Sequence, residues 1–396
     1  MLRFLTAGES HGPSLTVIVE GLPSGLAITQ EQIGDELSRR RLGYGRGPRM
    51  RFERDQLRLI GGIRHGRTLG SPVAIEILNS EWPKWEQEMS AAPGTPSNKL
   101  TKPRPGHADL AGMQKYAFDD ARDVLERASA RETAARVVAG ALAKALLATI
   151  DVQVLSHVVR VGEVAAPPGI RPQPGELDAV DESEVRCFDQ ATATLMIAEI
   201  KAAAKEGDSL GGIVEVIAYG VPVGLGSYVH WDRKLDGLIA GALMSIQAVK
   251  AVEIGDGMIQ ASQRGSVAHD AIAVDETFVQ GGGYIRRSAH AGGLEGGLTS
   301  GAPVIAKVAM KPLATLNRPV LETVDVATGE STVSFKERTD VTAVPALGVV
   351  SEAMLSLVLA NEALRKFGGD SVEEFVRNHE SYVANLGSTS SHARSD

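Results

Sequence analysis

The chain has 396 residues, 43% of them hydrophobic, and a formal net charge of −8, which is an ordinary composition for a globular protein with a large buried core. A single cysteine, Cys187, excludes an internal disulfide framework and a cysteine-rich zinc site, so we expect no metal and a cytoplasmic location. No uninterrupted apolar run reaches the ~20 residues of a membrane span, residues 1–6 are too short and too polar for a signal peptide, and the negative charge disfavours nucleic acid as a partner.

Hydrophobic periodicity and turn residues predict the elements in chain order. We expect a strand over 14–20, a helix over 29–41 opened by a Thr29–Gln32 capping box, strands over 57–63 and 73–78, a loop over 91–105 and one alanine-rich helix over 119–150. Then follow a strand over 152–161, a surface excursion over 167–184, a helix over 189–206, a strand over 210–221, a helix over 234–252, a glycine-rich stretch over 281–301, a strand over 303–310 and a helix over 349–367. Several strands follow one another directly, which indicates a layered α+β fold. We expect one domain over 1–385 and a disordered tail over 386–396.

A cluster of seven arginines, interleaved with glycine and proline, lies between residues 39 and 54: Arg39, Arg40, Arg41, Arg46, Arg49, Arg51 and Arg54. Guanidinium groups bind carboxylates and phosphates bidentately, and their crowding is self-repulsive unless an anion neutralises it. A small multivalent anion explains the cluster, and so does a solvated helix end paired with surface acids. Nucleic acid explains it less well, because only Tyr44 and Phe52 could stack on bases.

Two loops each place a histidine near glycine, His11 in the segment Gly8-Glu-Ser-His-Gly12 and His107 in the segment Arg104-Pro-Gly-His-Ala-Asp109. Histidine titrates near neutral pH, so both are candidate general acids, although a single histidine is more often structural. The Gly-x-Ser-x-Gly order of the first loop does not indicate a serine hydrolase, because a strand and not a helix is predicted to follow.

Two further short patterns have simple structural explanations beside the functional one. Arg127 and Arg131 lie one helical turn apart, and Arg127 could pair with Asp123. Asp340, in Arg338-Thr-Asp340, could cap the final helix.

Taken together, these patterns resemble the chorismate synthase family. The matching segments, in the family's order, are Gly8-Glu-Ser-His-Gly12 through Pro23, the arginine run 39–47, Arg104 to Asp109, Glu126-Arg-Ala-Ser-Ala-Arg-Glu-Thr-Ala-Ala-Arg136, Gly255-Asp-Gly257, Ala291-Gly-Gly-Leu-Glu-Gly-Gly297, Lys311-Pro312 and Arg338-Thr-Asp340. The resemblance extends from Leu2 to about Asp370. It implies helices sandwiched between two antiparallel β-sheets, and a homotetramer.

The resemblance implies a carbon–oxygen lyase of the shikimate pathway to the aromatic amino acids. Such an enzyme catalyses the 1,4-anti-elimination of phosphate from 5-enolpyruvylshikimate 3-phosphate and forms chorismate. It requires reduced flavin mononucleotide (FMN), although the reaction has no net redox change. The substrate has one phosphate and two carboxylates, so it is the kind of anion that the arginine cluster favours.

The resemblance also implies the site residues, motif by motif. His11 would donate a proton to the leaving phosphate, His107 would stabilise or protonate the reduced flavin, and Asp340 would assist proton removal from the substrate ring by way of flavin N5. The substrate would be bound by Arg40, Arg46, Arg49, Arg104, Arg131 and Arg338. The flavin would contact Arg127, Ala128, Ser129, Gln247, Ala248, Gly296, Lys311, Pro312, Leu313, Ala314, Thr315 and Arg338.

The sequence departs from the family pattern at Ala289 and Ser300, where asparagine is common; His290 or the Ser300 hydroxyl could replace a lost flavin or subunit contact. The chain lacks the extra segment of members that reduce their own flavin with NADPH. We therefore expect a monofunctional enzyme served by an external flavin reductase, with NADPH only as an indirect reductant. One alternative is an NAD(P)H-dependent flavin reductase, which should show a Gly-x-Gly-x-x-Gly turn. Another is a non-catalytic polyanion-binding module, which should show a broad basic face.

Overall fold

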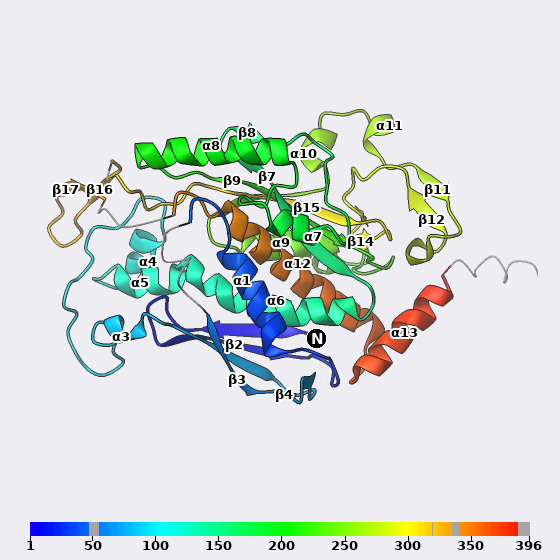
Figure 1. The fold of residues 1–396 in the computed structure, drawn as a ribbon, viewed down its shortest axis with the longest axis horizontal. Coiled ribbons are helices and arrows are strands. Elements are labelled where there is room, and N and C mark those ends of the chain that lie inside the picture. Colours follow the sequence, from blue (N-terminus) through cyan, green and yellow to red (C-terminus); the bar gives the residue numbers. More distant parts are fainter. Residues whose placement is uncertain (47–54, 319, 335–339, 387–396) are drawn as a thin grey trace, which may run out of the picture.

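The computed structural model describes residues 1–46, 55–318, 320–334 and 340–386 and arranges them as helices between two antiparallel β-sheets (Figure 1). The first sheet has the strand order β1 (Arg3–Ala7), β2 (Ser14–Glu20), β6 (Val73–Leu78) and β3 (Gln56–Gly61). The second has the order β10 (Val249–Ile254), β15 (Val304–Met310), β9 (Gly212–Tyr219), β7 (Gln153–Val161) and β8 (Val164–Ala165). The predicted α+β sandwich is confirmed.

Alternation along the strands gives the first sheet one apolar face. Leu15, Val17 and Val19 of β2 are buried, whereas Ile18 between them is exposed. Successive side chains of a strand point to opposite faces, so the buried set faces the helical layer. Helix α6 (Thr133–Ala148) contacts this face at β2, and α1 (Gln30–Arg41) packs beside α6.

The long helix α12 (Val344–Phe367) joins the two halves, because it packs against α6 on one side and against β7 and β9 on the other. It is long and apolar enough to span a membrane by length and composition, but 89% of its most apolar window is buried inside the fold, as in the core helix of a globular protein. A Cβ atom on Gly140 of α6 would lie 2.3 Å from the Cβ of Ala353. The two helices therefore touch at a point where only glycine fits.

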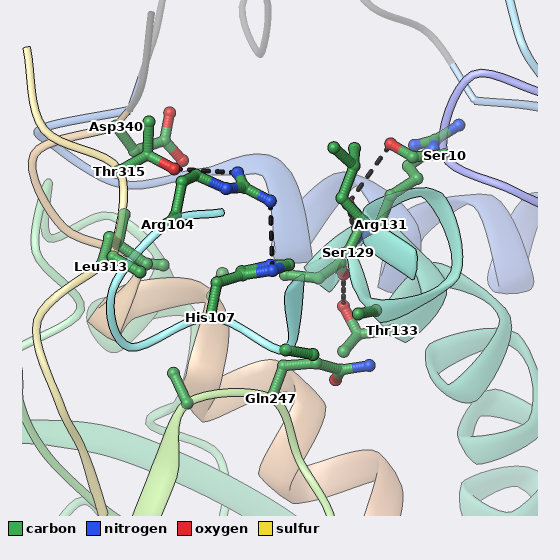
Figure 2. Close-up of a pocket in the computed structure, with 18 of the residues that line it drawn as sticks. Ser10, Arg104, His107, Ser129, Arg131, Thr133, Gln247, Leu313, Thr315 and Asp340 are labelled. Atoms are coloured by element: carbon green, nitrogen blue, oxygen red, sulfur yellow. Dashed lines mark hydrogen bonds between the residues drawn. The ribbon is translucent and has the colours of Figure 1, made fainter. Parts of the chain in front are cut away.

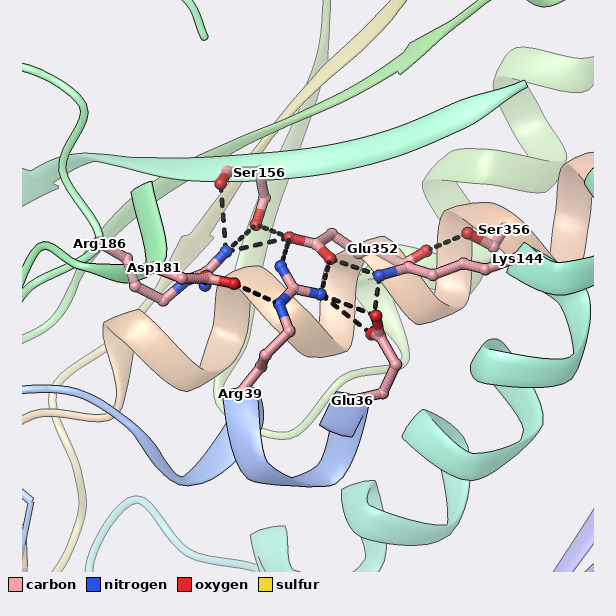
Figure 3. Close-up of polar contacts among 8 residues, drawn as sticks. All are labelled: Glu36, Arg39, Lys144, Ser156, Asp181, Arg186, Glu352 and Ser356. Atoms are coloured by element: carbon pink, nitrogen blue, oxygen red, sulfur yellow. Dashed lines mark hydrogen bonds and ion pairs between the residues drawn. The ribbon is translucent and has the colours of Figure 1, made fainter. Parts of the chain in front are cut away.

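A buried ionic cluster of six charged side chains ties the helical layer together (Figure 3). Its members are Glu36, Arg39, Lys144, Asp181, Arg186 and Glu352. Glu352 has no exposed side-chain surface, and its carboxylate accepts hydrogen bonds from Arg39 at 2.8 and 3.1 Å and from Arg186 at 3.1 Å. Three cations face three carboxylates, so the cluster is neutral. Arg39, the first member of the arginine cluster, therefore has a structural role.

The remaining elements are shorter or lie outside the helical layer. The helices are α3 (Trp82–Trp85), α4 (Asp109–Tyr116), α5 (Arg122–Ala128), α7 (Leu177–Asp181), α8 (Gln190–Glu206), α9 (Leu235–Met244), α10 (Gly257–Gln260), α11 (Gly265–Ala268) and α13 (Val372–Ala384), with 3-10 turns η1 (Ala130–Glu132), η2 (Trp231–Arg233) and η3 (Val279–Gly281). The two-stranded ribbons pair β4 (Ile63–Arg64) with β5 (Arg67–Thr68), β11 (Ile272–Val274) with β12 (Tyr284–Arg286), β13 (Leu294–Glu295) with β14 (Leu298–Thr299), and β16 (Glu322–Val324) with β17 (Ser331–Val333).

Most predicted elements are confirmed, including the capping box, in which Thr29 Oγ1 accepts from the Gln32 amide at 3.2 Å. The single helix over 119–150 is wrong, because Ser129 takes an extended backbone and separates α5 from η1 and α6. The helix over 234–252 is wrong in its second half. Ala248 there has a left-handed φ of 65°, and β10 follows. The helix predicted over 349–367 is α12, which begins five residues before the predicted start, at Val344.

Most of the buried apolar side chains form one large cluster that runs from Leu2 to Phe375 and contains members of both sheets. The single domain over 1–385 stays a prediction. The strand β1 and the helix α13 were not predicted. Of the predicted disordered tail, 387–396 lies outside the described residues.

Candidate active site

A cavity of about 1210 Å³ opens at one end of the helical layer (Figure 2). Segments that are far apart in the sequence form its walls: residues 10–11, 40–46, 81–88, 97–108, 122–133, 245–248, 310–315 and 340–350. The loop before β2, the ends of α1, α6 and α12, helix α5 and the end of β15 therefore contribute to one site.

The cavity collects most of the predicted site residues. It is lined by the three predicted catalytic residues and by four of the six predicted substrate arginines: His11, His107, Asp340, Arg40, Arg46, Arg104 and Arg131. It is also lined by most of the predicted flavin contacts: Ala128, Ser129, Gln247, Ala248, Lys311, Pro312, Leu313, Ala314 and Thr315.

Four predicted residues are not placed on this cavity. Arg127 lines a neighbouring cavity of about 380 Å³, where its guanidinium donates to the carbonyl oxygens of Thr6 and Gly8 at 2.9 and 3.1 Å. Gly296 lies in the turn between β13 and β14. Arg49 and Arg338 lie outside the described residues.

The two positions that depart from the family pattern do not line the cavity either. Ala289 packs against the apolar side chains of Leu155, Ile217 and Ile305 on the second sheet. The Ser300 hydroxyl is buried and donates to the carbonyl oxygen of Gly293 at 3.1 Å, and His290 pairs with Asp256 at 3.0 Å. Neither the serine nor His290 therefore replaces a contact in this cavity.

The break between α5 and α6 positions the centre of the site. The Ser129 hydroxyl accepts from the backbone amide of Arg131 at 3.3 Å, as a helix N-cap does, and lies 3.3 Å from the Ser10 hydroxyl. The turn directs Arg131 into the cavity wall, where its guanidinium lies 2.6 Å from Asp55. In one continuous helix, successive side chains would point in different directions around the helix axis, so Ser129 and Arg131 would not have these positions.

The arginines are buried and held in place. Arg40 is only 5% exposed, and its guanidinium donates to the Thr133 hydroxyl at 2.9 Å and to the Ala130 carbonyl at 3.0 Å. Arg46 lies 3.3 Å from the carboxylate of Asp340. Several guanidinium groups therefore line one cavity in a protein of net charge −8, and such groups can bind an anionic ligand through paired hydrogen bonds.

His107 and Arg104 share one buried carboxylate. Asp109 accepts from Arg104 Nε at 2.8 Å and contacts His107 Nδ1, and its side chain has no exposed surface. Burial alone would raise the pKa of Asp109, but hydrogen bonds from His107 and Arg104 and the charge of Arg104 outweigh it and hold the pKa well below its ordinary value. Asp109 is therefore an ionised anchor for both side chains.

Three residues near His11 were not predicted: Trp85, Arg122 and Glu126. The His11 ring lies on Trp85 with the ring centroids 4.0 Å apart, and its Nδ1 lies 2.9 Å from Glu126. Glu126 begins one of the motifs quoted from the sequence, so its position was visible, although its role was not. Within the described ranges, no group of three or more His, Cys, Asp or Glu side chains could hold a metal ion.

Comparisons with known proteins agree over nearly the whole chain. A family model described as chorismate synthase matches residues 2–364. Chorismate synthases of Frankia casuarinae and Frankia alni are each 59% identical to the chain over 396 residues, covering 98% of it and 99% of the relative. The Salinispora tropica enzyme is 58% identical over 392 residues, covering 97% and 98%. A crystal structure of chorismate synthase matches with a TM-score of 0.78 and 39% identity, over 98% of each chain.

Proposed function

The chain belongs to the chorismate synthase family, whose members are lyases, and from this premise we propose that it eliminates phosphate from 5-enolpyruvylshikimate 3-phosphate to form chorismate. The observation that carries the proposal is the convergence of buried arginines, two histidines and Asp340 on one cavity. The substrate has three anionic groups, and guanidinium groups bind phosphate and carboxylate by paired hydrogen bonds. The reaction would require reduced FMN without net redox change and would supply aromatic amino acid biosynthesis.

The cavity has the size and lining that a flavin and a substrate require together. Its volume of about 1210 Å³ exceeds the ~300–1,000 Å³ usual for the site of one small ligand. Pro312 and Leu313 contribute apolar surface, on which a flavin ring could lie. The side-chain oxygen of Gln247 is buried and has no hydrogen-bond partner in the described part of the chain, so it could accept from a flavin N–H.

Bound reduced FMN would supply the electron density that breaks the carbon–oxygen bond. Arg40, Arg104 and Arg131 would orient the anionic substrate and neutralise the charge that develops on the departing phosphate. His11 would donate a proton to that phosphate, and His107 would hold a proton beside the flavin ring. Asp340, held by Arg46, would take part in removing the ring hydrogen.

We further propose a cytoplasmic homotetramer that receives reduced flavin from an external flavin reductase. Large apolar side chains are exposed on the single chain, among them Leu5 at 69%, Tyr228 at 71% and Trp231 at 78%. Subunit contacts would cover such side chains in an assembly.

An anaerobic assay with the substrate and photoreduced FMN, followed by chorismate absorbance, tests the proposal. Chorismate formed only with prereduced flavin supports a monofunctional lyase. Chorismate formed with oxidised FMN plus NADPH would mean that the enzyme reduces its own flavin, and it would refute the proposed external reductase. A folded protein that forms no chorismate in either assay would refute the proposed function.

A further inference from the structure

A buried carboxylate faces the ring of His11 from α5. Both oxygens of Glu126 lie near His11 Nδ1, at 2.9 and 3.1 Å, and one of them accepts from the His11 backbone amide at 2.8 Å. The Glu126 side chain is only 2% exposed. The Ser10 amide also donates to the Glu126 backbone carbonyl at 3.0 Å, so the loop before β2 is fixed to α5 at two successive residues.

The protonation state of the contact follows from its chemistry. Burial alone would raise the pKa of Glu126, but hydrogen bonds and charge from His11, with Arg122, outweigh burial and lower it. An ionised carboxylate only accepts, so Nδ1 must carry the proton in this contact. The other ring nitrogen, Nε2, has no hydrogen bond within the described part of the chain. It is therefore the nitrogen that can act on a ligand.

The ring is also fixed from its face. Trp85 lies against it at 4.0 Å with the two planes inclined by 30°, and the Arg122 guanidinium lies 5.0 Å from the centre of the Trp85 ring. Arg122 donates to Glu126 at 3.2 Å and lies 3.8 Å from Glu88. Three groups of charged residues lie around His11. Helix α5 contributes Glu126 and Arg122, and the segment 81–88, which carries Trp85, contributes Glu81, Lys84 and Glu88. Glu9 lies two residues before His11 in the chain.

We infer that Glu126 is a positioning residue for proton transfer: it accepts the Nδ1–H of His11 and fixes the direction of the ring, so that the Nε2–H of the protonated imidazolium faces the leaving phosphate. Transfer of the Nε2 proton to the phosphate leaves the neutral Nδ1–H tautomer, which the same contact with Glu126 stabilises. The inference rests on the proposed function, in which His11 is the acid. A carboxylate on one ring nitrogen is a general way to orient the other one. The arrangement recurs at His107, whose Nδ1 contacts Asp109, but Asp109 also holds Arg104, which is assigned to substrate binding, and so offers no clean test.

The test is a double-mutant cycle on turnover, with Glu126→Gln, His11→Ala and the double variant assayed anaerobically with prereduced FMN. Glu126→Gln keeps the shape and removes the charge; we expect kcat to fall about 100-fold, within the range that a positioned acid supplies, with KM changed by less than about 3-fold. In the His11→Ala background the same change should have almost no further effect, because Glu126 acts through the ring.

Two further variants serve as controls for an effect of the substitution on the structure in general. Glu215→Gln alters another buried histidine–carboxylate contact, that with His157 at 3.4 Å on the second sheet, and it should leave kcat unchanged. Glu126→Asp keeps the charge one methylene farther back and should retain more activity than Glu126→Gln.

A fluorescence measurement gives a readout that does not depend on turnover. The chain has three tryptophans, so Trp82→Phe with Trp231→Phe leaves Trp85 alone against the His11 ring. Stacked imidazole changes indole emission, so Glu126→Gln should shift the Trp85 emission toward that of His11→Ala.

The outcomes separate the inference from the proposed function. If the effects of His11→Ala and Glu126→Gln multiply, or if Glu126→Gln leaves both kcat and the Trp85 emission unchanged, the positioning role is refuted while the lyase stands. If the wild type forms no chorismate, the proposed function fails, and the Trp85 emission still decides whether Glu126 holds the ring.

Discussion

Replacing Glu352 with glutamine tests the ionic cluster of α1, α6 and α12. The change leaves Arg39, Lys144 and Arg186 facing only Glu36 and Asp181, a net charge of +1 in a buried site. One oxygen of Glu352 accepts from Arg39, Arg186 and Ser156, and the other from Arg39 and Lys144. If the side-chain oxygen of glutamine takes the place of the first oxygen, the hydrogen bonds from Arg39 and Lys144 to the second oxygen are lost.

At about 1.5–3 kcal/mol for each such bond, the loss is about 3–6 kcal/mol. Removal of one partner from a buried ion pair generally costs about 3–5 kcal/mol, in agreement with this figure. Equilibrium urea unfolding followed by far-UV circular dichroism would measure it. Glu20→Gln, which removes the exposed pair with Arg3, is the matched control and should cost at most about 1 kcal/mol.

Neutrality can be restored in the same background. Lys144→Met removes one of the cations that face Glu352, so we expect Glu352→Gln with Lys144→Met to be more stable than Glu352→Gln alone. A loss below about 1 kcal/mol in Glu352→Gln would refute the reasoning, since it would mean that the cluster tolerates an uncompensated buried charge.

Three further predictions concern acid stability, catalysis and helix packing. Burial would raise the pKa of Glu36 and Glu352, but Lys144 and Arg39 outweigh burial and hold both pKa values below the ordinary 4.5. Below about that pH the unfolded chain binds more protons than the folded one, so the unfolding free energy should decrease as the pH falls. Measured from pH 7 to pH 3, the decrease should be less steep in Glu352→Gln. His107→Ala and Asp340→Ala should each reduce turnover severely in the anaerobic assay while size-exclusion chromatography shows an unchanged assembly, and near-normal activity in either would contradict its assigned role. Gly140→Ala would force a methyl group into Ala353 and should lower the unfolding free energy by about 1–3 kcal/mol; an unchanged urea midpoint would mean that α6 and α12 separate without cost.

Local signals predicted much of the fold where they agreed with the packing. The capping box at Thr29 and the alternation of β2 and β6 are confirmed because the propensity of each segment and its burial favour the same structure. The break at Ser129 was missed because the alanines on both sides favour a helix. The signal was present, since Ser129-Ala-Arg-Glu132 has the spacing of a capping box.

Strand β10 was missed for a different reason. Val249-Lys-Ala-Val-Glu-Ile254 follows a helix with few intervening breakers, and its strand conformation depends on pairing with β15, which lies about 55 residues later in the chain. Pairing between segments so far apart leaves no trace in local periodicity.

The candidate site was predicted from motifs, but its supporting contacts were not. Residue type made His11 and His107 candidates, and Glu126 and Asp109 lie in the quoted motifs, but nothing in the sequence indicated that these two carboxylates hold the two histidines. Trp85 comes from a segment without a recognisable pattern and reaches His11 only through the fold. Such contacts depend on three-dimensional proximity, which a single sequence does not show.

The position of α12 in the chain has a consequence for how the protein is made. This helix lies between the two sheets, yet it is the last large core element that the ribosome synthesises, at residues 344–367. Until it emerges, the inner face of the second sheet lacks the helix that packs along both β7 and β9, and Arg39, Lys144 and Arg186 lack their shared carboxylate. A nascent chain of 340 residues therefore exposes surface that the finished protein buries, and exposed apolar surface of this kind makes incomplete chains prone to aggregation.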